Sequence, residues 1–243
     1  MTVVAFDFDG TLSDSEMTVL LGDQCDRAEE TSADDGAQRR SVADQMDEIT
    51  ERAMNDEIEY AESLRQRCAL LEGLDDEKAQ AAFDEVRLRP GAADVIRALR
   101  EAGVYVAILT GGFERGVAAA LDREGVEVDA IVANRLPVKD GKSEAGTASE
   151  NASGQRPRVL TGAVEGPLIE GKKDDALEVL TAVVGEDRED TIAVGDGAND
   201  LPMLEAAGFA IGFEPKPNVA PACESIVETM DELHDLFEAE GVL

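Results

Sequence analysis

Two aspartates, two positions apart, carry the clearest chemical signal in the sequence. Asp7 and Asp9 follow Val3–Phe6, a short apolar run typical of a buried strand, and they precede a Gly-Thr pair that turns the chain away. Alternate residues of a strand point to the same side, and a parallel sheet places its site at the carboxyl ends of its strands. Such a pair can supply a nucleophile, a general acid or base, or ligands for a hard metal ion.

A second acidic loop, residues 195–200 with the sequence GDGAND, follows another apolar run at residues 191–194. It brings Asp196 and Asp200 to the same edge of the expected sheet. Carboxylates about 4 Å apart repel one another by about 1–4 kcal/mol per pair at effective dielectric constants between those of water and a protein surface. A divalent hard cation removes that repulsion, and Mg²⁺ suits a phosphate partner. An EF-hand calcium loop is excluded, because neither acidic stretch has the Gly and Glu that such a loop needs at its sixth and twelfth positions.

Two further segments favour an anionic ligand. Thr110-Gly111-Gly112 stands between an expected strand at residues 104–109 and an expected helix at 113–123, where a hydroxyl and free backbone N–H groups can bind an anion. Lys173, preceded by a second lysine, opens another expected helix, which is the unfavourable end of the helix dipole for a cation. A phosphate group to be neutralised would explain that lysine.

The single histidine narrows the possible chemistry. His234 lies in a C-terminal helical pattern far from these motifs, so catalysis by Ser-His-Asp or Cys-His groups and zinc binding through histidine are not expected. The three cysteines, Cys25, Cys68 and Cys223, are odd in number and widely spaced, which fits a reducing cytoplasm rather than a disulfide framework.

The order of the elements predicts an α/β fold with a doubly wound, Rossmann-like parallel sheet. Residues 13–88 are helical in pattern and almost free of Gly and Pro, which predicts a helical cap domain inserted after the first strand of a core formed by residues 1–12 and 89–243. Residues 134–168 are expected to form a hairpin with a long tip. Segments 29–40 and 143–158 are polar and are expected to be mobile loop insertions.

The net charge of the chain indicates which kinds of partner it can bind. With 22 Lys and Arg against 54 Asp and Glu, the formal net charge is −32, which disfavours nucleic acid and anionic membranes as partners. No apolar run approaches the ~18 residues of a membrane span, and the N-terminus lacks the basic segment of a signal peptide, so we expect a cytoplasmic protein. Acids spread along the whole chain favour adaptation to a salt-rich cytoplasm over an ordinary acidic protein.

Taken in order, a strand followed by DxDGT, a strand followed by TGG, a lysine at a helix start and a strand followed by GDGxxD resemble the haloacid dehalogenase superfamily of phosphotransfer enzymes. In more detail the chain is similar to the phosphoserine phosphatase family, over nearly its whole length except segments 29–40 and 143–158. The segments that carry this likeness are 50–54, 60–67, 109–113, 133–136, 138–141 and 194–203.

The resemblance implies a role for each matching residue. Asp7 would be the nucleophile that forms an aspartyl phosphate, and Asp9 would protonate the leaving hydroxyl and then activate water. Mg²⁺ would be held by Asp7, the Asp9 backbone carbonyl and Asp196, with Asp200 in support. Thr110 and Lys173 would hold the phosphoryl oxygens. The implied substrate-binding positions are Glu16 and Arg67 for the ammonium and carboxylate groups, Met54 and Tyr60 in the cap, and Gly111 and Asn199 in the pocket. Thr110 departs from the family pattern, which usually has Ser there.

The resemblance therefore implies a Mg²⁺-dependent enzyme that hydrolyses O-phosphoserine in serine biosynthesis. A phosphatase for another small phosphomonoester, or a phosphotransferase that passes the group to another alcohol such as homoserine, stays open as the alternative. A phospho-receiver domain, which is also doubly wound and phosphorylated on Asp, is disfavoured by Asp9, by the helical cap and by the length of 243 residues. The oligomeric state stays open.

Overall fold

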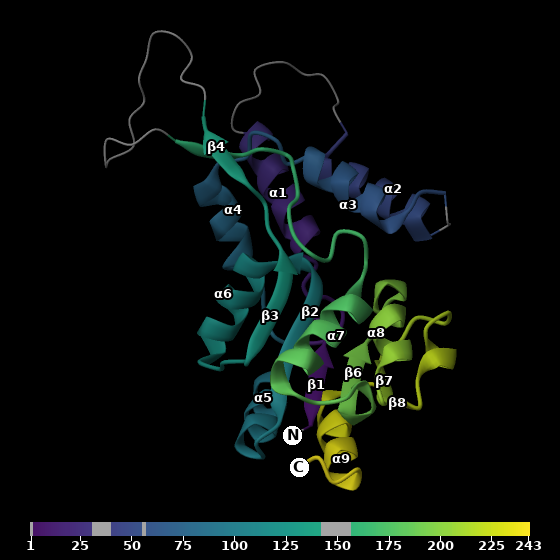
Figure 1. The fold of residues 1–243 in the computed structure, drawn as a ribbon. Coiled ribbons are helices and arrows are strands. Elements are labelled where there is room, and N and C mark those ends of the chain that lie inside the picture. Colours follow the sequence, from purple (N-terminus) through teal and green to yellow (C-terminus); the bar gives the residue numbers. More distant parts are fainter. Residues whose placement is uncertain (1, 31–39, 55–56, 142–156) are drawn as a thin grey trace. The chain divides into compact units, whose positions relative to one another are not determined.

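Two compact units make up the part of the chain that the computed structural model describes, residues 2–30, 40–54, 57–141 and 157–243 (Figure 1). The core unit comprises Met1–Glu16, Val86–Asn134 and Gly166–Leu243, and the helical unit comprises Met17–Glu85 and Arg135–Glu165. The sequence pattern places residues 135–165 with the core, whereas the structure groups them with the helical unit.

A six-stranded parallel sheet forms the centre of the core unit, in the order β3-β2-β1-β6-β7-β8. Its strands are β1 (Val3–Phe6), β2 (Tyr105–Phe113), β3 (Ala130–Asn134), β6 (Thr191–Gly195), β7 (Phe209–Phe213) and β8 (Ser225–Val227). The predicted doubly wound α/β fold is thereby confirmed. The strand order reverses at β1, between β2 and β6, and open sheets of this kind bind ligands outside the carboxyl ends of their strands at such a reversal.

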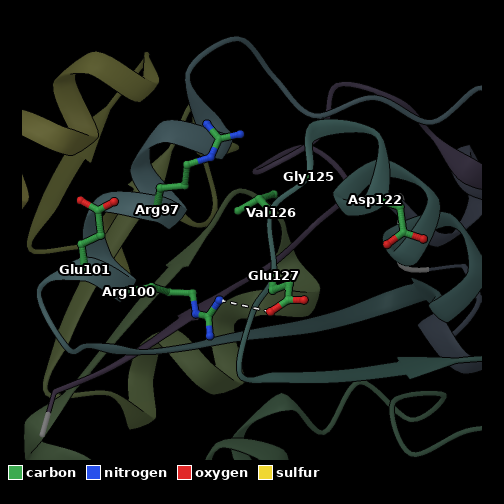
Figure 2. A pocket seen from close by; sticks show the side chains of 7 residues that line it. All are labelled: Arg97, Arg100, Glu101, Asp122, Gly125, Val126 and Glu127. Carbon is green, nitrogen blue, oxygen red and sulfur yellow. Dashed lines mark ion pairs between the residues drawn. The ribbon is translucent and has the colours of Figure 1, made fainter.

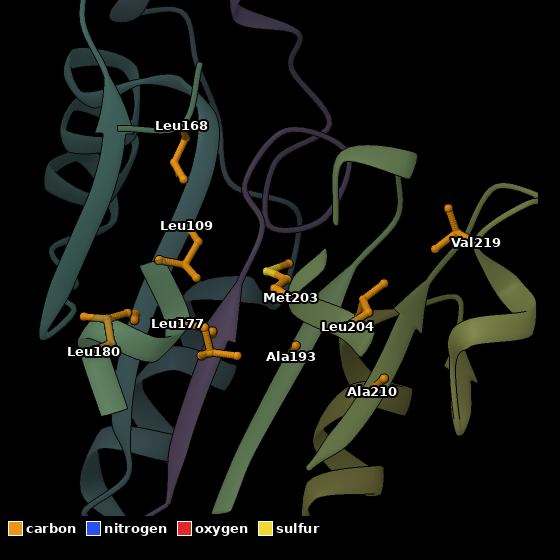
Figure 3. Close-up of a cluster of buried hydrophobic side chains, with 11 residues drawn as sticks. Leu109, Leu168, Leu177, Leu180, Ala193, Met203, Leu204, Ala210 and Val219 are labelled. Carbon is orange, nitrogen blue, oxygen red and sulfur yellow. The ribbon is translucent and has the colours of Figure 1, made fainter. Parts of the chain in front are cut away.

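Helices cover both faces of this sheet. They are α5 (Ala92–Glu101), α6 (Glu114–Glu124), α7 (Lys173–Val184), α8 (Leu201–Ala206) and α9 (Met230–Ala239). On one face Ala5 belongs to a buried apolar cluster with Leu177 of α7 and Met203 of α8 (Figure 3). On the other face Phe6 meets Phe237 of α9 edge to face, with ring centroids 6.4 Å apart. Strand β1 is thus fully buried between two apolar layers, which fixes the point where its carboxyl end leaves the sheet.

The described residues of the helical unit form four helices and a hairpin. Its elements are α1 (Met17–Glu30), α2 (Val42–Met54), α3 (Tyr60–Ala69), α4 (Asp76–Phe83), β4 (Val138–Asp140) and β5 (Arg158–Leu160). The predicted hairpin is present as the antiparallel pair β4 and β5. Leu160 accepts a hydrogen bond from Gly73 N–H (3.0 Å) and donates one to Leu74 O (2.8 Å), so the hairpin is attached to the loop between α3 and α4. These bonds explain why the hairpin belongs to this unit.

Several boundaries differ from the sequence pattern. Strand β2 continues through two glycines to Phe113, with a register shift after Leu109, so that α6 begins at Glu114. The two predicted loop insertions fall mainly on residues 31–39 and 142–156, which lie outside the described residues. Among the described residues, none of the helices combines the length and the apolar character that crossing a membrane requires.

Candidate active site

The carboxyl ends of β1 and β6 bring the two acidic loops together. Asp7 directly follows β1, and its N–H donates to Val194 O of β6 at 2.9 Å. The second loop turns close above the first: a Cβ on Gly10 would lie 2.7 Å from the carboxylate of Asp196, and the φ angle of Gly10 is +91°. Gly10 is therefore needed both for its backbone conformation and for the close approach of the two loops.

A buried lysine joins these loops to α7. Lys173, the first residue of that helix, forms ion pairs through its Nζ with Asp7 Oδ1 and, at 2.5 Å, with Asp200 Oδ1. All three side chains are at most 3% exposed. Burial alone would lower the pKa of Lys173, but Asp200 and Asp7 together raise it, so the ammonium stays protonated at neutral pH.

Asp200 also fixes the second acidic loop. Its Oδ2 accepts hydrogen bonds from the N–H groups of Asp196 (3.1 Å) and Gly197 (2.9 Å), while its Oδ1 binds Lys173. Both oxygens of this fully buried carboxylate thus accept hydrogen bonds, one from the lysine and the other from the loop. Asp200 thereby connects the second acidic loop to Lys173.

Like charges dominate the electrostatics of the site. Burial raises the pKa of Asp7 to about 8, and Asp200 adds to the rise while Lys173 opposes it. Burial followed by the charge of Asp200 raises the pKa of Asp196 to about 6. The pKa of Asp9 is raised well above its usual range, first by burial and then by Glu16 and Asp7. The ammonium groups of Lys173 and, at 3.6 Å from Asp196, Lys216 do not balance this group of carboxylates.

The residues present fit a divalent hard cation. Carboxylate oxygens of Asp7, Asp196 and Asp200 lie within 4.8 Å of one another. Asp9 Oδ1 is buried and, within the described part of the chain, has no hydrogen-bond partner. An oxygen-only donor set with unbalanced negative charge is what Mg²⁺ requires.

Thr110 lies at the end of β2, on the other side of β1 from Asp196. Its side chain is 1% exposed, and its Oγ1 accepts a hydrogen bond from Gly112 N–H at 2.9 Å. The expectation that Thr110-Gly111-Gly112 stands directly at a helix start is wrong, because the strand continues to Phe113. The hydroxyl is instead presented by an irregular strand end.

The other candidate residues lie in both units. In the core unit, Gly111 is buried, Asn199 is half-buried, and the exposed Glu16 raises the pKa of both Asp9 and Asp196. In the helical unit, Arg67 of α3 donates from Nη1 to Thr18 Oγ1 (3.2 Å), and its buried Nε has no partner among the described residues. Also in the helical unit, half-buried Tyr60 opens α3 and Met54 ends α2, and the side chain of Met54 lies outside what the structure describes.

Two cations at the site are not apparent from the sequence motifs. Arg89 donates from Nη2 to Gly10 O (3.1 Å), pairs through Nη1 with Glu214 (2.8 Å) and lies over the Phe213 ring, 5.0 Å from its centroid. Lys216 Nζ lies 3.6 Å from Asp196 Oδ2. Arg89 precedes a Pro-Gly turn and Lys216 follows β7, and neither position has a spacing rule that relates it to the acidic loops.

A separate surface pocket of about 420 Å³ lies beyond the site (Figure 2). It is formed by the end of α5 and the segment after α6, at the amino ends of β2 and β3. Its arginines, Arg97 and Arg100, pair with acids including Asp94 and Glu127. The pocket is at the opposite edge of the sheet from Asp7 and does not contribute to the site.

Comparison with known proteins places this geometry among phosphatases. The model of the haloacid dehalogenase-like hydrolase family matches residues 4–205. The chain is 47% identical over 242 residues, all of both chains, to a phosphoserine phosphatase from Halobacterium salinarum. It is 34% identical over 230 residues to a phosphoserine phosphatase from Methanocaldococcus jannaschii, covering 94% of this chain and 93% of the relative.

Solved structures give the same result. A phospho-aspartyl intermediate analogue of a phosphoserine phosphatase has a TM-score of 0.77 and 31% identity, over 97% of this chain and 98% of that chain. A substrate-bound phosphoserine phosphatase complex has the same score and identity, over 97% and 96% of the two chains.

Proposed function

Because the chain belongs to the haloacid dehalogenase-like hydrolase family, we propose that the site around Asp7 hydrolyses O-phosphoserine to serine and phosphate. The observation that carries this function is the buried Asp7 at the carboxyl end of β1, ion-paired to Lys173 and surrounded by further carboxylates. The chain is a phosphomonoester hydrolase of the phosphoserine phosphatase type, and serine biosynthesis is the known context of that family.

In the proposed first step, a carboxylate oxygen of Asp7 attacks phosphorus and the bond between phosphorus and the serine oxygen breaks. Asp9 donates its proton to the leaving oxygen, and the phosphoryl group is then covalently held as an aspartyl phosphate. The raised pKa of Asp9 supports this role, because it favours the protonated carboxyl that the acid step needs.

In the second step, ionised Asp9 takes a proton from water, which attacks phosphorus and releases phosphate. The bond to Asp7 breaks and the carboxylate is restored. Lys173 and the Thr110 hydroxyl would bind the phosphoryl oxygens and stabilise the charge that develops there.

Mg²⁺ is the proposed cofactor, held by Asp7, Asp196 and the backbone carbonyl of Asp9, with Asp200 in support. When bound, it neutralises the carboxylates and the phosphoryl oxygens. The cluster of Asp7, Asp196 and Asp200 carboxylates, whose oxygens lie within 4.8 Å of one another, supports this assignment.

The remaining residues are proposed to select the substrate. Glu16 offers a carboxylate for the ammonium group, and Arg67 offers a planar guanidinium for the carboxylate. The proposed contributions of Met54, Tyr60, Gly111 and Asn199 rest on the resemblance of their positions to the family. We keep the cytoplasm as the proposed location, which the three free cysteine thiols support.

The test is phosphate release from L-O-phosphoserine beside sugar phosphates, with Mg²⁺ and with excess chelator. We expect Mg²⁺-dependent release with a clear preference for O-phosphoserine. Equal rates on the sugar phosphates would contradict the proposed substrate. Homoserine added to the same assay tests the alternative, because formation of phosphohomoserine would show transfer rather than hydrolysis.

A further inference from the structure

Asn134, the last residue of β3, has a fully buried amide side chain whose two ends bind two different loops. Its Nδ2 donates to Gly111 O at 3.0 Å, and its Oδ1 accepts from Leu168 N–H at 3.1 Å. These partners define the orientation of the amide, because a carbonyl must face the NH₂ group and an N–H must face the oxygen. A buried amide satisfied at both ends fixes the separation of the two loops, since leaving either group unpaired is costly.

The first loop leads to Thr110. Gly111 O and Gly112 N–H belong to the same peptide unit, which is planar. Asn134 donates to the carbonyl of this peptide, and the N–H of the same peptide donates to Thr110 Oγ1 at 2.9 Å. The Thr110 oxygen therefore accepts a bond from one side, and its own proton is available for a different acceptor. Asn134 orients the peptide that orients this hydroxyl.

The second loop leads to Lys173 through consecutive backbone hydrogen bonds. Leu168, bound by Asn134, accepts through its carbonyl from Gly171 N–H at 3.3 Å, and Gly171 O accepts from Lys173 N–H at 3.0 Å. The start of this segment also lies against Asn134: a Cβ on Gly166 would be 2.7 Å from Asn134 Cα, and the φ angle of Gly166 is +150°. The segment that leads to Lys173 is thus held in place by the same amide side chain of Asn134.

We propose that Asn134 is a positioning residue for phosphoryl transfer, which sets the Thr110 hydroxyl and the Lys173 ammonium relative to each other by binding the loops that carry both. This inference rests on the proposed function, because that function assigns the two groups to the phosphoryl oxygens. Among the described residues, the Asn134 side chain hydrogen-bonds to Gly111 and Leu168 and not to Asp7 or Asp9.

The test compares Asn134→Leu, which has a similar volume and no polar group, with the wild-type chain. We expect kcat per folded molecule to fall about 10–100-fold, the usual effect of losing a residue that orients a site group. KM for O-phosphoserine should change less than about threefold, since the two groups stabilise the transition state more than the bound substrate. Asn134→Ser, which keeps a hydroxyl too short to bridge both loops, should show the same pattern and serves if the leucine variant does not fold.

Thr191→Val is the matched control. Thr191 is 1% exposed and also bridges two backbone segments, donating to Arg188 O at 2.6 Å and accepting from Gly208 N–H at 3.4 Å, but it opens β6 at the amino end of the sheet. It should lower the urea midpoint of unfolding and leave kcat of the folded enzyme within about twofold. An equal loss of kcat in this control would show that Asn134 contributes to the fold in general and has no specific role in positioning the site groups.

A double-mutant cycle with Thr110→Val tests the path of the effect. In that background, Asn134→Leu should cost clearly less than its original factor, because the hydroxyl it orients is gone and only its effect through the Lys173 segment remains. A full, multiplicative loss would contradict the inference, and so would an unchanged kcat in both Asn134 variants. The factor should be the same for p-nitrophenyl phosphate, which shares the phosphoryl group. A wild-type chain that hydrolyses p-nitrophenyl phosphate but not O-phosphoserine would overturn the proposed substrate and still leave the role of Asn134 measurable.

Discussion

At the scale of single residues, the site holds negative charge that the fold alone does not neutralise. Lys173 is shared between Asp7 and Asp200, and among the described residues Asp196 pairs with the partly exposed Lys216 at 3.6 Å. Removing water from several carboxylates is costly unless a cation or a proton compensates. The raised pKa values of Asp7 and Asp196 express that cost, and a protein keeps such an arrangement where charge is to be bound or moved.

Replacing the two aspartates of the first loop should separate the two proposed roles. Asp7→Asn should abolish turnover and keep the fold, because the amide has the same shape but is no nucleophile. Asp9→Asn should lower kcat by about 10²–10⁴, the usual size of a general acid–base contribution. Single-turnover assays with labelled substrate measure both, and far-UV circular dichroism checks the fold. Full activity in Asp7→Asn would refute covalent catalysis at this residue.

Substrate selection should depend on the charges of Glu16 and Arg67. O-phosphoserine carries an ammonium and a carboxylate beside its phosphate, and p-nitrophenyl phosphate carries neither. We expect Arg67→Ala and Glu16→Gln each to cost about 2–4 kcal/mol in kcat/KM for O-phosphoserine, because a charged group of the substrate loses its partner. The same variants should hardly affect p-nitrophenyl phosphate.

Equal losses on both substrates would leave a general phosphatase without an amino-acid pocket. Arg65→Ala is a suitable control, because it removes another arginine from α3 at an exposed position. It should leave both values of kcat/KM near those of the wild-type chain.

At the scale of elements, the sequence predicts those strands and helices that are determined by their own residues, and not those that depend on contacts with distant segments. The buried strands before Asp7 and Asp196 are short apolar runs. The hydrophobic pattern predicts both, because their own residues are sufficient to indicate a buried strand. The continuation of β2 through Gly111 and Gly112 has no such signal, since glycine disfavours a strand and pairing with β3 decides the outcome.

Tertiary contacts decide the remaining differences. The hairpin joins the helical unit through the bonds of Leu160 with Gly73 and Leu74, which are more than eighty positions away in the chain. Asn134 is one of five asparagines in the sequence, and its bridging role follows from its burial between Gly111 and Leu168, which no local pattern predicts. The position of Arg89 at the site likewise depends on its contacts with Gly10 and Glu214, which are distant in sequence.

The start of α9 gives a prediction at this scale. Thr229 is the N-cap, and its side chain accepts from Glu232 N–H at 3.1 Å. Thr229→Ala should lower the free energy of unfolding by about 0.5–2 kcal/mol, because one N–H of the first turn loses its acceptor. Urea unfolding of the full chain measures this loss. Thr229→Ser keeps the acceptor and should recover most of the stability, and both variants should keep wild-type kcat because the cap is remote from the acidic loops in sequence and in contacts.

At the scale of the whole molecule, charge is the dominant feature. A formal net charge of −32 on 243 residues works against compaction at low ionic strength, because like charges repel over the Debye length. Several of the described ion pairs, such as Lys139 with Glu72 and Arg40 with Glu48, join partly exposed side chains, and pairs of this kind contribute little each. Local pairing therefore does not offset the general repulsion.

Salt should then stabilise the chain and assist the reaction together. Raising KCl from about 0.1 M to about 1 M shortens the Debye length from about 10 Å to about 3 Å, which screens repulsion within the protein and between the protein and its anionic substrate. We expect both the urea midpoint of unfolding and kcat/KM for O-phosphoserine to rise over this range. Sucrose at matched water activity is the control, since it favours compact states without screening charge; it should raise the midpoint less and leave kcat/KM nearly unchanged. A steady fall of both quantities with KCl would show that the acidic surface is not an adaptation to salt, and that the fold tolerates its charge by local means.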